Sequence, residues 1–257
     1  MDDMEKDKVK RVLNLPPVAR VKYKSNFIKT AVCELRFPTL LELESKPPKD
    51  FQAKIRKLYP FYEPEVMQRF GDSEGDSNEH RYLFRSKDRH WTITVKSFAL
   101  AIETSRYVDF EDFFARFKLV LDSAKEMIDS DFFTRIGFRY INSIPIEDGK
   151  LDGWIRPELI LPLTEGALGS IKSSASIIHG YMEQGEYSLR HGLKTEDKGN
   201  MGNDVPNYVL DVDYYSENIE FDKVEHLIKH FNETNFAFFS WCLGEKAKKL
   251  LGEGKQK

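Results

Sequence analysis

Two aspartates, Asp211 and Asp213, are the strongest candidates for reactive groups, because they lie two residues apart in an alternating segment. Residues at i and i+2 of a strand point to the same face of a sheet, so the two carboxylates would lie side by side. Paired carboxylates can hold a divalent metal ion or transfer protons, as they do in many nucleases. The competing interpretation is that each carboxylate pairs with an arginine on a neighbouring strand of a water-exposed sheet face.

Charged residues that share one strand face occur in two other strand-like segments. Glu34 and Arg36 share one face of the first segment, and Arg135 and Arg139 share one face of the second. A face with this many charges is not part of a hydrophobic core. We therefore expect the strands to meet and form a polar binding groove. Its residues would be Glu34, Arg36, Arg135, Arg139, Asp211 and Asp213.

Signatures of the common catalytic centres are missing from the sequence. It has no GxxxxGK[ST] loop and no GxGxxG turn, which excludes an ordinary P-loop or Rossmann enzyme, and it has no GxSxG elbow. His226 and His230 have the spacing of zinc ligands, but the helical period turns both away from the apolar stripe, so a solvated helix face explains them. Cys33 and Cys242 lie in apolar segments and should be buried, unreactive thiols. We expect no catalytic residue, no metal and no cofactor.

The segment 80–96 mixes basic and aromatic residues, a composition found in proteins that bind single-stranded nucleic acids. Strand alternation would place Arg81 and Arg85 on one face and Tyr82 and Phe84 on the other, so that bases could not stack beside the charges. A basic edge strand that opposes aggregation explains the same residues. Nucleic acid is therefore the less favoured partner.

Composition and charge narrow the class of protein. The chain has 257 residues, 19 Phe, 11 Tyr and a net charge of −3 from 39 basic and 42 acidic side chains. The aromatic content predicts a folded core, and the charge balance argues against a protein built wholly around a phosphate backbone. The apolar runs are too short for a membrane span, and the first residues lack a signal-peptide core. With only two cysteines, we expect no disulfide and a cytoplasmic location.

The hydrophobic period predicts the order of elements along the chain. Asp109 is expected to cap the clearest helix, which spans 110–128 and has two acidic residues in its first turn. Other helices are expected from 47 to 60, from about 221, and over 236–251. Strands are expected over 27–37, 80–86, 91–104 with a bend near residue 97, 132–144 and 207–215, with a hairpin over 174–191. The polar tracts 71–80 and 195–206 have the composition of loops.

These elements occur in the same order twice, as strand, crossover, antiparallel strands and long amphipathic helix. The pair Arg36-Phe37 corresponds to Arg139-Tyr140, which suggests an internal duplication. We therefore predict an α+β fold of two related halves, each an antiparallel sheet packed against a long helix. The expected divisions are a charged N-terminal arm (1–25), the two halves (26–130 and 131–251) and a loose tail (252–257).

Three short motifs, AVCELRF at 31–37, LYP at 58–60 and GFRYIN at 137–142, resemble those of a sporadically distributed bacterial family of unknown function. The similarity in layout extends from about residue 26 to residue 250. It implies a bacterial cytoplasmic protein, encoded by an accessory gene of the kind found near mobile or defence loci. It carries no catalytic residues over to this chain.

The expected function is that of a non-catalytic binding or adaptor protein of such an accessory system, which would bind a protein or a small molecule through the polar sheet face and the two glycine-rich loops. The alternative is a metal-dependent hydrolase, such as a nuclease, that uses Asp211 and Asp213 with Glu34 nearby. A homodimer formed by pairing of exposed strand edges is a further expectation.

Overall fold

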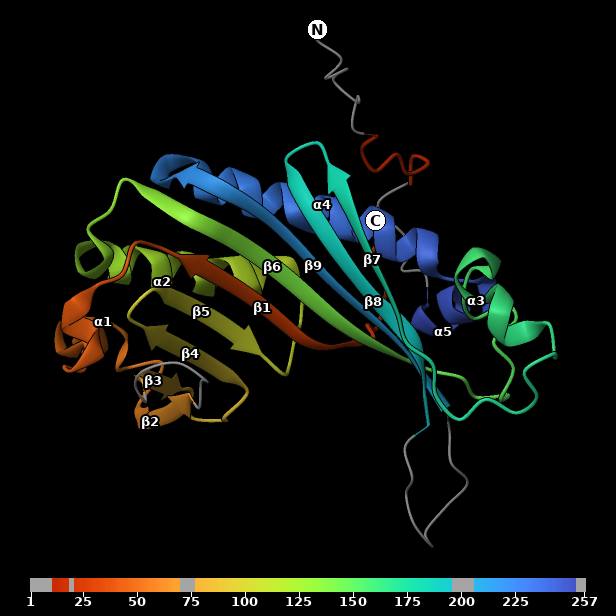
Figure 1. Cartoon of the computed structure of the whole chain (residues 1–257), viewed down its shortest axis with the longest axis horizontal. Helices are drawn as coiled ribbons and strands as arrows, with labels where there is room; N and C mark the ends of the chain where they lie inside the picture. Colours follow the sequence, from red (N-terminus) through yellow and green to blue (C-terminus); the bar gives the residue numbers. More distant parts are fainter. Residues whose placement is uncertain (1–10, 19–20, 70–76, 196–205, 253–257) are drawn as a thin grey trace, which may run out of the picture.

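The computed structural model describes residues 11–18, 21–69, 77–195 and 206–252. Within them the chain forms an α+β fold with one antiparallel sheet of nine strands and five α-helices, which confirms the predicted class (Figure 1). The strands are β1 (Ile28–Arg36), β2 (Phe61–Arg69), β3 (Ser77–Arg85), β4 (Trp91–Lys96), β5 (Ala99–Thr104), β6 (Phe132–Pro145), β7 (Ser176–Met182), β8 (Gly185–Thr195) and β9 (Pro206–Glu220). The helices are α1 (Lys49–Ile55), α2 (Phe110–Ile128), α3 (Pro157–Thr164), α4 (Val224–Cys242) and α5 (Glu245–Leu251), with short 3-10 turns η1 (Leu41–Glu44) and η3 (Phe221–Lys223).

The strand order is β2-β3-β4-β5-β1-β6-β9-β8-β7, so β1 and β6 meet in the middle of the sheet. β1 lies beside β5, the strand that precedes α2, and β6 lies beside β9, the strand that leads through η3 into α4. Each half of the chain therefore starts at the centre of the sheet, crosses to an edge strand, and returns strand by strand to the centre before its long helix.

The helix α2 forms where the apolar period and the cap signals predict it. The Asp109 side chain accepts a hydrogen bond from the amide of Asp112 at 2.9 Å, which satisfies one free donor of the first turn. Asp129 ends the helix in the left-handed region at φ 41°. The buried stripe packs on the sheet, and the ring of Phe113 lies 4.9 Å from that of Phe138 on β6.

The helix α4 covers the second half of the sheet in the same way. The rings of Phe231 and Tyr214 lie 6.2 Å apart, and those of Phe238 and Tyr187 lie 5.6 Å apart, so α4 contacts β9 and β8. Figure 1 shows α2 and α4 on the same side of the sheet. We call the opposite side, which neither long helix covers, the outer face.

Several boundaries differ from the prediction. The strand β2 was not expected, and with it in place β3 lies between β2 and β4 rather than at an edge. The segment 91–104 is a hairpin rather than one bent strand, because Lys96 pairs with Ala99 across a two-residue turn. The helix expected to begin at residue 236 is the end of α4, and α5 is a separate helix after Gly244.

Parts of the two predicted loops lie outside the described residues, which leave out 70–76 and 196–205. Residues 77–80 belong to β3 rather than to a loop. Cys33 and Cys242 are both buried, as predicted, and burial raises the pKa of each thiol well above its ordinary value. None of the helices in the described ranges has the length and apolarity needed to cross a bilayer.

Candidate binding face of the sheet

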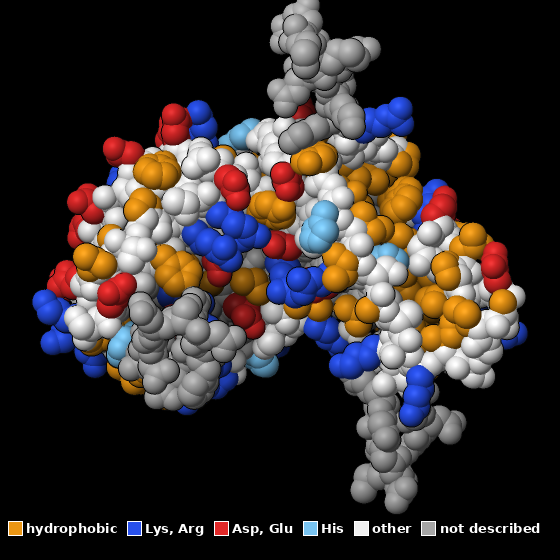
Figure 2. Space-filling model, in the orientation of Figure 1, with side chains coloured by type: hydrophobic (Ala, Val, Ile, Leu, Met, Phe, Trp, Pro, Cys, Tyr) orange, Lys and Arg blue, Asp and Glu red, His pale blue; other side chains and the backbone are white. Residues whose placement is uncertain are grey.

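The outer face brings together the six residues that the sequence predicted for the groove. Glu34 and Arg36 lie on β1, Arg135 and Arg139 on β6, and Asp211 and Asp213 on β9, and these three strands are consecutive in the sheet. Their alternation partners, such as Phe138 and Val212, are buried on the helix side. Figure 2 shows this face, with basic side chains gathered at its centre and acidic side chains beside them.

Arg135 is held at the centre of the face by three kinds of contact. Its Nη2 donates to Asp213 Oδ2 at 2.7 Å, its Nη1 lies 3.7 Å from Glu34 Oε1, and its Cζ lies 4.6 Å from the centre of the Tyr215 ring. Gly137 makes this position accessible, because a Cβ there would lie 2.7 Å from the Arg135 Nη1. The absence of a side chain at residue 137 thus leaves room for the Arg135 guanidinium next to the strand.

Arg139 and Asp211 form a second, bidentate ion pair. The Arg139 Nε and Nη2 each donate to one Asp211 oxygen at 2.6 Å. The Asp211 side chain is only 12% exposed, whereas that of Arg139 is 40% exposed. Its hydrogen bond with Asp211 raises the pKa of Arg139, so this guanidinium stays charged and partly open to solvent.

Glu34 joins the two arginines that flank it. Its Oε1 accepts a hydrogen bond from the Arg36 Nε at 2.7 Å and also faces Arg135. Burial raises the pKa of Asp213, and the neighbouring Arg135 and Arg139 oppose that shift. The network therefore alternates in charge across the three central strands.

Three residues that sequence reasoning did not assign extend this face. The Tyr215 hydroxyl donates to Glu186 Oε2 on β8 at 2.7 Å, and this hydrogen bond raises the pKa of Tyr215 to about 12. Arg190, also on β8, is directly opposite Asp211 in the strand register. It is exposed and forms no ion pair with any residue in the described ranges. The alternation of residues along β8 places Glu186 and Arg190 on one face of that strand, but only the order of strands shows that this face belongs to the outer face of the sheet.

The arrangement of the carboxylates bears on the hydrolase alternative. Both oxygens of Asp211 accept hydrogen bonds from Arg139, and Oδ2 of Asp213 accepts one from Arg135, so a divalent cation shared by the two carboxylates would have to compete with Arg139. Among the described residues no group of three or more His, Cys, Asp or Glu side chains is placed to hold a metal ion. On α4, His226 is exposed, as expected, whereas the expectation that His230 also faces solvent is wrong, because His230 is half-buried beside Phe231.

The basic segment on β3 lies further along the outer face, with its charges already paired. Arg85 donates to Glu63 on β2 at 2.7 Å, and Arg81 donates to Glu79 at 2.8 Å. Burial raises the pKa of Glu79, but hydrogen bonds from Lys96 and Arg81 outweigh it and bring the pKa down to about 2. Tyr82 and Phe84 are buried on the other side, as predicted.

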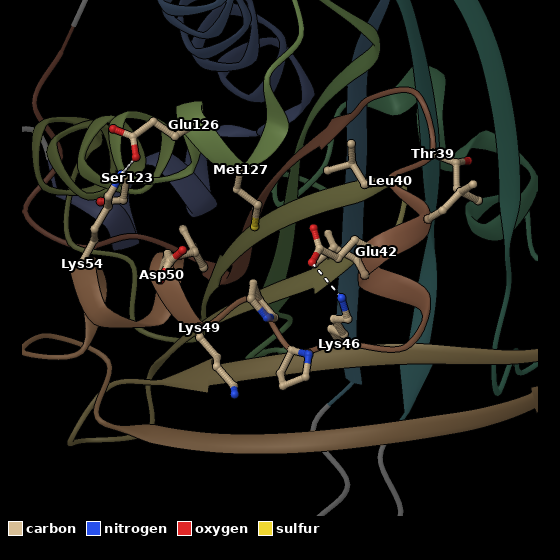
Figure 3. Close-up of a pocket in the computed structure, with 15 residues that line it drawn as sticks. Thr39, Leu40, Glu42, Lys46, Lys49, Asp50, Lys54, Ser123, Glu126 and Met127 are labelled. Carbon is tan, nitrogen blue, oxygen red and sulfur yellow. Dashed lines mark hydrogen bonds and ion pairs between the residues drawn. The ribbon is translucent and has the colours of Figure 1, made fainter.

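A cavity of about 770 Å³ lies away from this face, between η1, α1 and the end of α2. Figure 3 shows that Lys46 faces Glu42, at 3.4 Å, and that Lys54 reaches Glu126 on α2, at 2.6 Å. Both lysines are thus engaged by carboxylates of the cavity wall. None of the six predicted groove residues lines this cavity.

The chain matches no protein-family model. A comparison with curated proteins gave no match either.

Proposed function

We propose that this protein is a non-catalytic binding or adaptor protein that holds a protein partner on the outer face of its sheet. The resemblance of its three motifs to a patchily distributed bacterial family supports a role in an accessory system of the mobile or defence type. The observation that carries the proposal is the uncovered central face, where Arg36, Arg139 and Arg190 remain partly or fully exposed.

Preorganisation of the arginines supports this role. Arg135 and Arg139 are fixed by carboxylates and by the ring of Tyr215, so a partner would lose little side-chain entropy when it binds them. Arginine and tyrosine are also the residues on which binding energy tends to concentrate in protein interfaces.

The charge pattern defines the kind of partner. Glu34, Asp213 and Asp211 are each engaged by an arginine of the same face, whereas Arg190 forms no ion pair with a described residue. Its donors, and those of Arg139 that point to solvent, suit carboxylates on the surface of another protein. We therefore propose a partner that presents acidic side chains to β6, β9 and β8.

Charge reversal at Arg190 tests the proposal. Quantitative capture from the native host would compare the wild type, Arg190→Glu and the control Arg56→Glu, which makes the same charge change at the exposed C-cap residue of α1. We expect one acidic protein to be captured by the wild type and the control but not by Arg190→Glu. Direct titration with that purified protein should show binding that weakens as salt is added.

Two results would contradict the proposal. Equal capture by all three proteins would show that the outer face is not the binding surface. Cleavage of DNA or RNA that requires a divalent metal ion and is lost in Asp211→Ala would favour the hydrolase instead.

We also propose that the two halves of the chain arose by internal duplication. If Arg36 corresponds to Arg139, then Glu34 corresponds to Gly137, and these two residues pair directly across β1 and β6. The centre of the sheet would thus lie on a pseudo-twofold axis. The equal lengths of α2 and α4, 19 residues each, support the same correspondence.

A homodimer through the edge of β7 remains our proposal for the oligomeric state. Ile177 and Ile178 are exposed on this edge, where only Val12 forms an isolated bridge among the described residues. Light scattering on the purified protein should give twice the mass of one chain, and a monomer at all concentrations would contradict it.

A further inference from the structure

A second candidate site lies on the helix side of the sheet, remote from the outer face. A cavity of about 670 Å³ opens between the start of α2, the middle of α4 and the segment 21–28. Its floor is formed by Tyr140 and Asn142, which point from β6 toward the helices. The volume lies within the range of sites that hold small molecules.

Polar groups line this cavity where hydrophobic residues would be expected. On α4, Asn232 and Asn235 occur three residues apart, so they lie on the same side of the helix. Asn232 Oδ1 accepts a hydrogen bond from the Tyr140 hydroxyl at 3.1 Å. Asn142 is buried and donates through Nδ2 to the carbonyl oxygen of Leu210 at 3.4 Å. The site is therefore built around three buried amides.

One of these amides lacks a partner. Asn235 is 8% exposed, and its Oδ1 is buried without a hydrogen-bond donor among the described residues. Such an orphaned acceptor is costly, and a buried polar group of this kind calls for an explanation beyond the fold itself. Because the residue lines the cavity, a donor on a bound ligand would satisfy it.

The remaining lining defines the chemistry of the ligand. The rings of Phe236 and Phe239 adjoin the amides on α4. The charged residues of the wall are Lys22 and Lys24, which are exposed, and Asp109 and Glu111 at the start of α2, of which Asp109 caps that helix. Amide groups recognise adenine through its exocyclic amine and adjacent ring nitrogen, and aromatic rings accept a base by stacking. The exposed ammonium groups of Lys22 and Lys24 suit a phosphate.

We infer that this cavity binds an adenine nucleotide, with the base against Asn232 and Asn235 and the phosphate toward Lys22 and Lys24. The site is independent of the outer face, so it adds a small-molecule ligand to the proposed protein partner.

Calorimetric titration of the full chain with AMP tests the inference. We expect saturable binding of AMP, weaker binding of GMP and no binding of ribose 5-phosphate. Asn235→Leu should weaken AMP binding about tenfold or more without lowering the melting temperature of the free protein, because it removes an unmatched acceptor.

Ser240→Ala is the matched control, because Ser240 lies on the same helix and its buried Oγ also lacks a partner among the described residues, but it does not line the cavity. This variant should bind AMP as the wild type does. Absence of AMP binding at millimolar concentration would overturn the inference. So would equal binding of ribose 5-phosphate, or unchanged AMP affinity in Asn235→Leu. The nucleotide comparison uses the wild type alone, so it decides the matter even if a variant fails to fold.

Discussion

Replacing Gly137 with alanine tests whether the Arg135 guanidinium is seated on the sheet as described. A Cβ at residue 137 would lie 2.7 Å from Nη1, 3.3 Å from Cζ and 3.4 Å from Nη2 of Arg135. The guanidinium must therefore lift away from the strand. That movement disturbs its hydrogen bond to Asp213, which is 2.7 Å long, and its contact with Tyr215.

The size of the effect follows from the two contacts. A charge-assisted hydrogen bond contributes about 1.5–3 kcal/mol, and a cation–π contact at a partly exposed site about 0.5–1 kcal/mol. Partial loss of both is offset by about 0.5–1 kcal/mol, because alanine is less flexible than glycine in the unfolded chain. We expect Gly137→Ala to lower the free energy of unfolding by about 1–2 kcal/mol, as measured by urea denaturation.

A second background makes the test sharper. In Arg135→Ala the three atoms closest to the new Cβ are gone, and no other atom lies within 3.4 Å of that position. The same Gly137→Ala change should then stabilise the protein by about 0.5–1 kcal/mol. If Gly137→Ala destabilises the wild type but stabilises Arg135→Ala, the result supports the position of the Arg135 guanidinium against residue 137. Destabilisation of similar size in both backgrounds would refute it, since the cost would then come from the backbone rather than from Arg135.

Three further predictions concern other parts of the chain. Burial lowers the pKa of His191, so the unfolded chain binds more protons than the folded one as pH falls below 6.5, and the free energy of unfolding should fall there. His191→Gln removes the titrating ring beside Tyr208. Measured by urea denaturation, the free energy of unfolding of this variant should fall less between about pH 7 and 5.5 than that of the wild type, and an equal fall in both proteins would contradict this. Asp109→Ala should cost about 1 kcal/mol through loss of the helix cap, measured by thermal unfolding, and no change would contradict the cap. Cys33 and Cys242 should react with a thiol reagent only after denaturation, and fast labelling of the native protein would contradict their burial.

Local sequence information was sufficient for the central elements. The apolar stripe and the acidic first turn located α2 with its cap at Asp109, and alternation placed Asp211 and Asp213 on the face opposite Leu210 and Val212. Both signals depend only on the period of the element that contains them. These parts of the fold therefore follow from residues close together in the chain.

The errors in the expected elements occur in segments whose own residues did not clearly indicate one type of secondary structure. No element was expected over 61–69. β2 tolerates Pro64, which has no amide hydrogen to donate, because among the described strands β2 pairs only with β3, which leaves one edge free of ladder hydrogen bonds. In the segment 91–104, the buried positions change from odd to even residues across Ser97 and Phe98, as in Val95 and Leu100. This change of phase marks a turn rather than a bend.

The assembly of the outer face depended on information that alternation does not contain. Each groove residue could be assigned to a face of its own strand, but the sequence did not specify that β1, β6, β9 and β8 are consecutive. Arg190 was missed for this reason, because its position opposite Asp211 follows only from the pairing of β8 with β9. The orphaned amide of Asn235 likewise becomes visible only when the surroundings of α4 are known.

The most direct test of the account is a footprint of the bound partner on this chain. Hydrogen exchange or hydroxyl-radical labelling would be measured on the captured complex and on the free protein. We predict protection on the outer face, centred on Arg139, Arg190 and Tyr215, with no change on the exposed sides of α2 and α4. Protection confined to those helices, with Arg190 labelled equally in both states, would contradict the claim that the uncovered sheet face binds the partner.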